Sequence, residues 1–126
     1  MKVLGIGFDM VEVARIQRIW EKFGDAFLQR VFGEEELSYC LKMRQPELHL
    51  AARFAAKEAI VKALGSGIGA VRWRDLVITK ESSGAPWIKL SGAALACLEA
   101  MGGKVIKVSL SHTQHYAGAQ AIVLSS

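Results

Sequence analysis

Segments rich in β-branched residues alternate with alanine-rich or charged segments along the chain, and glycine or proline separates them. β-Branched runs bounded by turn residues indicate strands, whereas apolar residues recurring at helical spacing indicate helices. The pattern predicts strands over Val3–Val13, Leu76–Lys80, Trp87–Leu90, Val105–Ser111 and Ala117–Leu124. It predicts helices over Ala14–Phe23, Ala26–Val31, Glu34–Met43, Leu48–Leu64 and Ser91–Met101.

Capping and turn residues predict where several of these elements begin and end. Asp25 is a candidate cap for the second helix, and Pro46 ends the third. Gly65 closes the long helix, and Ser91 caps the last one. Strands and helices are interspersed without a βαβ rhythm. We therefore expect one α+β domain over residues 1–126, with an antiparallel sheet, a long central helix and additional helices.

The long predicted helix carries four charged residues within an otherwise apolar stretch: Arg53, Lys57, Glu58 and Lys62. At helical spacing they do not form one polar face, so the helix is expected to be largely enclosed. A charge taken out of water costs several kcal/mol unless a partner compensates. Glu58 and Lys62 lie four positions apart, so they either pair with each other or line a site for a metal and a phosphate.

Asp9 interrupts the apolar, glycine-spaced strand that begins the chain. It either ends the strand, caps the next helix or binds a hard cation. Mg²⁺ takes one or two protein carboxylates together with phosphate oxygens and waters, and Asp9 with Glu58 fits that count.

Hydroxyl groups and an imidazole gather at a predicted strand end, in Ser109–Thr113. A Ser–His hydrolase is disfavoured because adjacent strand residues point to opposite faces and no G-x-S-x-G motif is present. A structural turn and a ligand-contacting loop both remain open here. The glycines of Gly65–Gly69 follow a helix instead of preceding one, which is unlike a dinucleotide or Walker loop.

Composition narrows the possible partners. The chain is 52% hydrophobic with a mean hydropathy of +0.25, an excess that either fills the core or covers a subunit interface. Its net charge of +4 suits an anionic cofactor or an acidic protein, and we find no nucleic-acid-binding signature. Cys40 and Cys97 form no metal or disulfide motif, which fits a reducing cytoplasm. No apolar run is long enough for a signal peptide or a membrane helix.

Taken together, these segments resemble the small bacterial 4′-phosphopantetheinyl transferases. The matching segments are the N-terminal Gly5–Ile16, the central Arg53–Ala59 and Lys62–Gly65, the Gly-x-Pro turn Gly84–Pro86 and the C-terminal Ser109–His112. Their order and spacing agree over essentially the whole chain, and the length points to the carrier-protein synthase branch. Phe8 departs from the family, which often has threonine there.

The resemblance implies transfer of 4′-phosphopantetheine from coenzyme A to a serine of apo-acyl carrier protein, for fatty acid biosynthesis, with release of 3′,5′-ADP. It implies Mg²⁺ held by Asp9 and Glu58, with Glu58 and Lys62 as catalytic residues. Glu58 would take the serine proton, directly or through a metal-bound water. A non-catalytic carrier-protein or nucleotide-binding module is the alternative, and the intact Asp9, Glu58 and Lys62 disfavour it.

The resemblance also implies a homotrimer with active sites between subunits. The residues implied to contact coenzyme A are Lys57, Lys62, Gly65, Ser66, Gly67, Pro86, Ser111, His112 and Thr113. His112 and its neighbours would reach the nucleotide end from an adjacent subunit. Arg15 and Arg18 share one face of the first predicted helix, so they either dock the acidic carrier protein or form an ordinary solvated surface pair.

Overall fold

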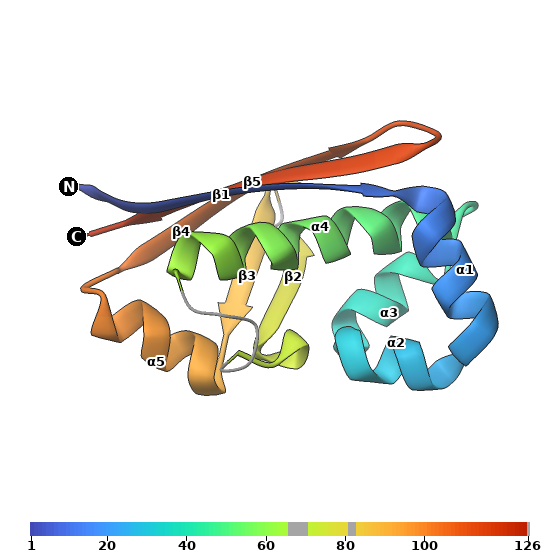
Figure 1. The fold of residues 1–126 in the computed structure, drawn as a ribbon, viewed down its shortest axis with the longest axis horizontal. Coiled ribbons are helices and arrows are strands. Elements are labelled where there is room, and N and C mark those ends of the chain that lie inside the picture. The colour runs from blue at the N-terminus through green and yellow to red at the C-terminus, as the bar shows by residue number, and fades with distance from the viewer. Residues whose placement is uncertain (66–70, 81–82, 126) are drawn as a thin grey trace.

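The structure is a computed structural model, and it describes residues 1–65, 71–80 and 83–125 (Figure 1). The strands are β1 (Val3–Glu12), β2 (Leu76–Lys80), β3 (Pro86–Leu90), β4 (Val105–His112) and β5 (Tyr116–Leu124). The helices are α1 (Val13–Phe23), α2 (Asp25–Val31), α3 (Glu34–Cys40), α4 (Pro46–Leu64), α5 (Gly92–Ala100) and the 3₁₀ turn η1 (Trp73–Asp75). None of the helices in these ranges is long and apolar enough to cross a membrane.

The strands form two antiparallel sheets, which confirms the α+β prediction. One sheet has the order β1-β5-β4, and the other is the β2-β3 hairpin. Helix α4 packs along the three-stranded sheet, and α1, α2 and α3 gather at its N-terminal end (Figure 1). Helix α5 lies near the C-terminal end of α4, away from α1, α2 and α3 and below the sheet end that carries both termini (Figure 1). The central helix is therefore covered from several directions, as its composition predicted.

Helix α4 begins two residues earlier than predicted. Pro46 occupies its first turn, where the missing N–H costs nothing and the fixed φ suits a helix. Gly65 follows the helix with a φ of 70°, the left-handed conformation that favours glycine, so the predicted stop is confirmed. The six alanines at positions 51, 52, 55, 56, 59 and 63 are all buried, which lets neighbouring elements approach the helix backbone.

Several predicted helix ends and caps differ in the structure. Asp25 does not cap α2; Gly24 holds that position with a φ of 58°, so one glycine ends α1 and starts α2. Helix α3 ends at Cys40 instead of Met43, because the chain turns there and the Met43 N–H donates to the Cys40 carbonyl. Ser91 does sit at the start of α5, but its hydroxyl makes no capping hydrogen bond.

Strand β1 lies against the backbone of α4 at two glycines. A Cβ on Gly5 would collide with the carbonyl oxygen of Ala63, and a Cβ on Gly7 would collide with that of Ala59. Side chains alternate between the two faces of a strand, so Asp9 shares the helix-facing side with these glycines. The glycine spacing thus brings β1 close enough to α4 for Asp9 to reach the helix.

The opposite side of the three-stranded sheet carries exposed apolar side chains. Ile6, Phe8 and Met10 of β1 are 67%, 59% and 57% exposed, and Tyr116 of β5 is also exposed. These four residues form what we call the outer sheet face. The apolar excess in the composition is therefore divided between a buried core and this uncovered surface.

The glycine contact predicts a large stability difference between two Gly→Ala substitutions. Gly7→Ala should destabilise the fold by roughly 2–3 kcal/mol or more, because its methyl group meets helix backbone that cannot rotate away. Gly118→Ala in β5 is the control, since its Cβ would be in ordinary contact at 3.6 Å from Met10 Cγ. Chemical denaturation of both variants measures the difference, and equal midpoints would contradict the close approach.

Candidate functional site

Asp9 and Lys62 meet where β1 crosses the C-terminal half of α4. The Lys62 ammonium lies 3.0 Å from Asp9 Oδ1 and donates to the Phe8 carbonyl at 2.9 Å. Its side chain is still about half exposed, at 52%. The alternative that Lys62 pairs with Glu58 along the helix is therefore not what the structure contains. The lysine instead links the strand to the helix.

Glu58 lies one helical turn before Lys62, and the charges of both Asp9 and Lys62 shift its pKa. Burial raises its pKa above the ordinary value, and the Asp9 carboxylate raises it further. The positive charges of Lys62 and Arg15 act in the opposite direction without cancelling the rise. Within the described ranges, Glu58 has no ion pair of its own. Two carboxylates that repel each other in a partly buried place form a site that a cation would stabilise.

The donor set at this place consists of two carboxylates. No group of three or more His, Cys, Asp or Glu side chains that could hold a metal occurs in the part of the chain that the structure describes. Sites for zinc normally need three or four protein ligands, whereas Mg²⁺ binds through one or two carboxylates and takes its other oxygens from substrate phosphates and water. Asp9 and Glu58 therefore fit Mg²⁺ in the presence of a phosphorylated ligand.

Lys57 does not have the ligand-binding position that the sequence predicted. Its side chain is fully buried, and its ammonium lies 2.6 Å from Glu36 Oε1. It also donates to the carbonyls of Val31 at 2.7 Å and Trp73 at 3.1 Å, which uses all three of its hydrogens. Burial lowers the pKa of Lys57, and the Glu36 carboxylate opposes that shift. We therefore assign Lys57 to the folding of the protein and withdraw it as a coenzyme A contact.

His112 and Pro86 line a second feature, a cavity of about 270 Å³ that we call the basic pocket. Its wall carries four basic side chains: His49, Arg53, Lys80 and His112. Arg53 is only 3% exposed, and its Nε has no hydrogen-bond partner. A buried guanidinium N–H without a hydrogen-bond partner is costly unless a ligand satisfies it, so this pocket is suited to an anion.

Arg53 belongs to the central motif but was expected to have no specific role, and His49 and Lys80 were not expected at a site. The signal for Arg53 was available, because a buried arginine with no acidic neighbour one turn away needs a partner from outside its helix. His49 and Lys80 could not be found in this way, since only the fold brings α3, α4, β2 and β4 together around one cavity.

The basic pocket and the carboxylate pair lie on opposite sides of α4. Arg53 and Lys62 are nine positions apart (62 − 53), as are His49 and Glu58 (58 − 49). Nine positions are about 2.5 turns of a helix with ~3.6 residues per turn, so each pair points in opposite directions. Within one chain the two features therefore face different surroundings.

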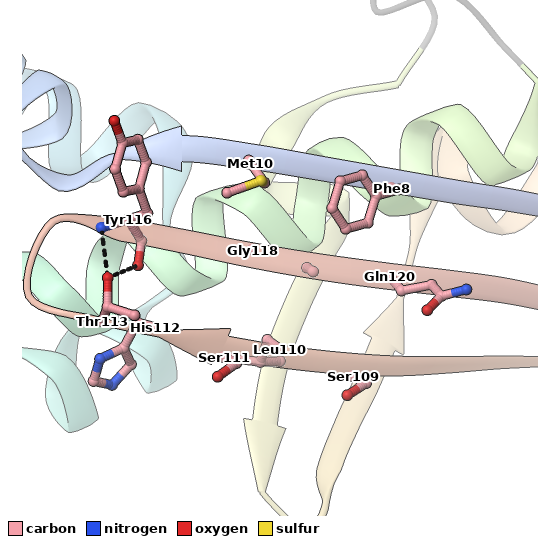
Figure 2. Close-up of a pocket in the computed structure, with 11 residues that line it drawn as sticks. Phe8, Met10, Ser109, Leu110, Ser111, His112, Thr113, Tyr116, Gly118 and Gln120 are labelled. Carbon is pink, nitrogen blue, oxygen red and sulfur yellow. Dashed lines mark hydrogen bonds between the residues drawn. The ribbon is translucent and has the colours of Figure 1, made fainter.

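Ser111 and Thr113 lie by a third feature, the shallow pocket drawn in Figure 2. This pocket of about 340 Å³ lies on the outer sheet face, next to Phe8, Met10 and Tyr116 (Figure 2). The Thr113 hydroxyl accepts hydrogen bonds from the backbone N–H groups of His115 and Tyr116, at 3.3 and 3.1 Å. Thr113 thus holds the β4–β5 turn, which was one of the two roles left open for this segment.

The other predicted site residues that the structure describes lie at the surface of the molecule. Gly65 is exposed at the end of α4, next to Lys62, while Ser66 and Gly67 lie outside the described residues. Arg15 and Arg18 are exposed on α1. The charge of Arg15 lowers the pKa of Glu58, so this arginine lies within electrostatic range of the carboxylate pair.

Comparisons with known proteins identify the family of the chain. Residues 5–120 match the family model of the 4′-phosphopantetheinyl transferase superfamily. The chain is 44% identical over 126 residues to a holo-[acyl-carrier-protein] synthase of Shewanella frigidimarina, covering 99% of this chain and 100% of the relative. The crystal structure of the synthase from Neisseria meningitidis superposes with a TM-score of 0.90 at 37% identity, covering 98% of this chain and 100% of the other. The Helicobacter pylori synthase in complex with coenzyme A gives a TM-score of 0.83 at 32% identity, with 94% and 99% covered.

The raised pKa of Glu58 predicts how stability depends on pH. A raised pKa means that the folded state holds the Glu58 proton more tightly than the unfolded chain does, so the ionised carboxylate costs stability above the folded pKa. Glu58→Gln should therefore raise the melting temperature at neutral pH, and the gain should vanish below the ordinary pKa of 4.5.

Added Mg²⁺ should raise the melting temperature of the wild type but not that of Glu58→Gln. Glu35→Gln is the matched control, because Glu35 is an exposed acid of α3 paired with Lys89 at 3.2 Å. Thermal unfolding across pH, with and without Mg²⁺, measures all three proteins. A Glu58→Gln protein that is destabilised at neutral pH would show that Glu58 stabilises the fold instead of preparing a cation site.

Proposed function

Because the chain belongs to the 4′-phosphopantetheinyl transferase superfamily, we propose that it is the enzyme that transfers 4′-phosphopantetheine from coenzyme A to a serine of apo-acyl carrier protein. It releases 3′,5′-ADP. The observation that carries this proposal is the near full-length similarity to holo-[acyl-carrier-protein] synthases, combined with the meeting of Asp9, Glu58 and Lys62. A binding module without catalysis would have no need for two repelling carboxylates beside a half-exposed lysine.

The reaction requires a proton acceptor and positive charge at the pyrophosphate. The serine oxygen attacks the β-phosphorus, the bond from that phosphorus to the 3′,5′-ADP oxygen breaks, and the serine proton leaves. Glu58 takes this proton, because it is a partly buried carboxylate beside Lys62 that has no ion pair of its own among the described residues. Lys62 supplies a positive charge from an exposed side chain to the phosphates. Asp9 and Glu58 would hold Mg²⁺, which would supply further positive charge to the pyrophosphate.

The basic pocket is the place for the nucleotide end of coenzyme A. Its lining includes His112, which the family resemblance assigns to that end, and Pro86, which it assigns to coenzyme A, and it adds Arg53 and Lys80. Arg53 offers a buried guanidinium with an unsatisfied N–H, which suits a phosphate. The nucleotide carries a 3′-phosphate, so charge and chemistry agree.

Two features support a homotrimer with shared sites. The carboxylate pair and the basic pocket lie on opposite sides of α4, so one chain cannot present both to the same coenzyme A molecule. A neighbouring subunit that contributes its basic pocket removes this difficulty. The outer sheet face, with Phe8 and Met10 more than half exposed, offers the apolar surface that such an assembly would bury.

Arg15 and Arg18 are proposed to dock the acidic carrier protein. Both are exposed on α1, and Arg15 lies within electrostatic range of the carboxylate pair, so a protein bound there would bring its serine near Glu58. Arg18 gives the cleaner test because the charges that shift the pKa of Glu58 are those of Asp9, Lys62 and Arg15. Arg18→Glu should raise the KM for carrier protein and leave that for coenzyme A unchanged, and equal effects on both substrates would contradict docking.

A cytoplasmic location stays a prediction, supported by the free thiols of Cys40 and Cys97.

Intact-mass analysis of apo-acyl carrier protein tests the activity directly. With coenzyme A and Mg²⁺, the wild type should add the mass of one phosphopantetheine per carrier protein. Glu58→Gln and Asp9→Asn should each lower turnover by on the order of 100-fold, comparable to the loss of an electrostatic stabiliser. The double variant should be little worse than either one, because both act at one place. Glu35→Gln should keep full turnover, and a wild type that modifies none of several apo carrier proteins would refute the proposal.

Mixing inactive subunits tests whether the sites are shared. Glu58→Gln and His112→Ala subunits should each be impaired alone, but mixed trimers should regain activity at interfaces that join an intact Glu58 to an intact His112. The control is a mixture of Glu58→Gln with Asp9→Asn, which should regain nothing because both residues belong to the same half-site. Light scattering should report a trimer. Full activity in a monomeric protein would contradict the assembly.

A further inference from the structure

The rings of Tyr39 and His49 contact the other basic side chains of the basic pocket, and neither ring has been given a role so far. The ring of Tyr39, from α3, lies 4.5 Å from the guanidinium carbon of Arg53 and 4.6 Å from the ammonium of Lys80. Lys80 also donates a hydrogen bond to the Tyr39 hydroxyl at 2.6 Å. One tyrosine therefore contacts two of the four basic groups of the pocket.

His49, from α4, continues this contact toward the fourth basic group. Its ring packs edge-to-face against Tyr39, with centroids 5.8 Å apart, and against His112 of β4, with centroids 5.3 Å apart. These are favourable separations for aromatic pairs. Tyr39, His49 and His112 thus form a row of three rings from three different elements, which we call the aromatic row.

His49 itself adds little charge to the pocket at neutral pH. Burial lowers its pKa, and the positive charges of His112, Arg53 and Lys80 lower it further, opposed only by Glu47. A neutral imidazole can pack against His112 without repelling it. His49 therefore serves the pocket through the shape and position of its ring.

The contact with Tyr39 matters most for Arg53. Among the described residues, Arg53 has no carboxylate partner, and its Nε makes no hydrogen bond. A buried arginine that served only the fold would be expected to have such partners, as the buried Lys57 has in Glu36. A ring face holds the guanidinium in place while leaving its N–H groups available to an anion.

We propose that Tyr39 and His49 are positioning residues that hold Arg53, Lys80 and His112 around the 3′-phosphate of coenzyme A and so determine the affinity for it. The inference rests on the proposed function, in which this pocket receives the nucleotide end. Tyr39 orients the two flexible cations, and His49 fixes the imidazole of His112. Neither residue touches the reacting β-phosphate, so both act on binding and not on the chemical step.

Steady-state kinetics with two donors tests this role. Tyr39→Leu and His49→Leu should each raise the KM for coenzyme A by about threefold to tenfold, as expected for the loss of an aromatic or cation–π contact, with kcat within about twofold of wild type. The KM for 3′-dephospho-coenzyme A, which lacks the phosphate, should change less than twofold. His49→Phe keeps the edge-to-face ring and should restore the KM for coenzyme A. Tyr39→Phe keeps the ring and should lie closer to wild type than Tyr39→Leu.

Phe27→Leu is the matched control. It removes an edge-to-face pair with Phe32, at 5.9 Å between centroids, that lies away from the pocket. It should lower stability without changing the KM ratio of the two donors. Equal KM changes for both donors, a loss confined to kcat, or failure of His49→Phe to restore the KM would each overturn the inference.

Calorimetric titration of 3′,5′-ADP and 5′-AMP separates this inference from the proposed activity. The leucine variants should weaken binding of 3′,5′-ADP by the same factor as the KM and leave 5′-AMP binding unchanged. If the wild type transferred no phosphopantetheine, the proposed function would fail while this binding result still decided the role of the aromatic row. Unchanged 3′,5′-ADP binding in both leucine variants would refute the positioning role even in an active enzyme.

Discussion

The backbone contact between β1 and α4 is the constraint on which the rest of the site depends. Gly5 and Gly7 leave no room between the strand and the carbonyls of the helix, so the next helix-facing residue, Asp9, comes within 3.0 Å of Lys62 and its charge acts on Glu58. Any side chain at either glycine would push the strand outward. The Asp9 carboxylate would then move away from Lys62, although neither residue had been substituted.

Most elements followed from the sequence because local patterns determine them. The glycine spacing of β1, the alanine-rich α4 and the stop at Gly65 each have a local physical cause, and the structure contains all three. The meeting of Asp9 with α4 was one of several alternatives that the residues left open, and the family resemblance selected it. Lys57 was misread because its motif gives no sign of which charge faces Glu36, a residue 21 positions away. The aromatic row was likewise invisible, since its rings come from separate elements.

Helix α4 organises the molecule by presenting different chemistry on different sides. One side carries Glu58 and Lys62 near β1, and the opposite side carries Arg53 and, one turn further along, Lys57, whose ammonium is buried in the core. This arrangement explains why the charges of the helix form no amphipathic pattern. It also gives a physical reason for assembly, because groups that one helix separates can act together only when another copy supplies the missing half.

The buried pair of Glu36 and Lys57 has a consequence for local motion. Glu36 accepts the backbone N–H of Gly33 at 2.9 Å and that of Ile78 at 3.0 Å, while Lys57 binds carbonyls at the end of α2 and in η1. Opening any of these segments alone would leave Glu36 or Lys57 buried without one of its hydrogen-bond partners. The amide proton of Gly33, in a short link between two seven-residue helices, should therefore exchange with solvent as slowly as those of the core strands. The link between α2 and α3 should therefore open only when the whole chain unfolds.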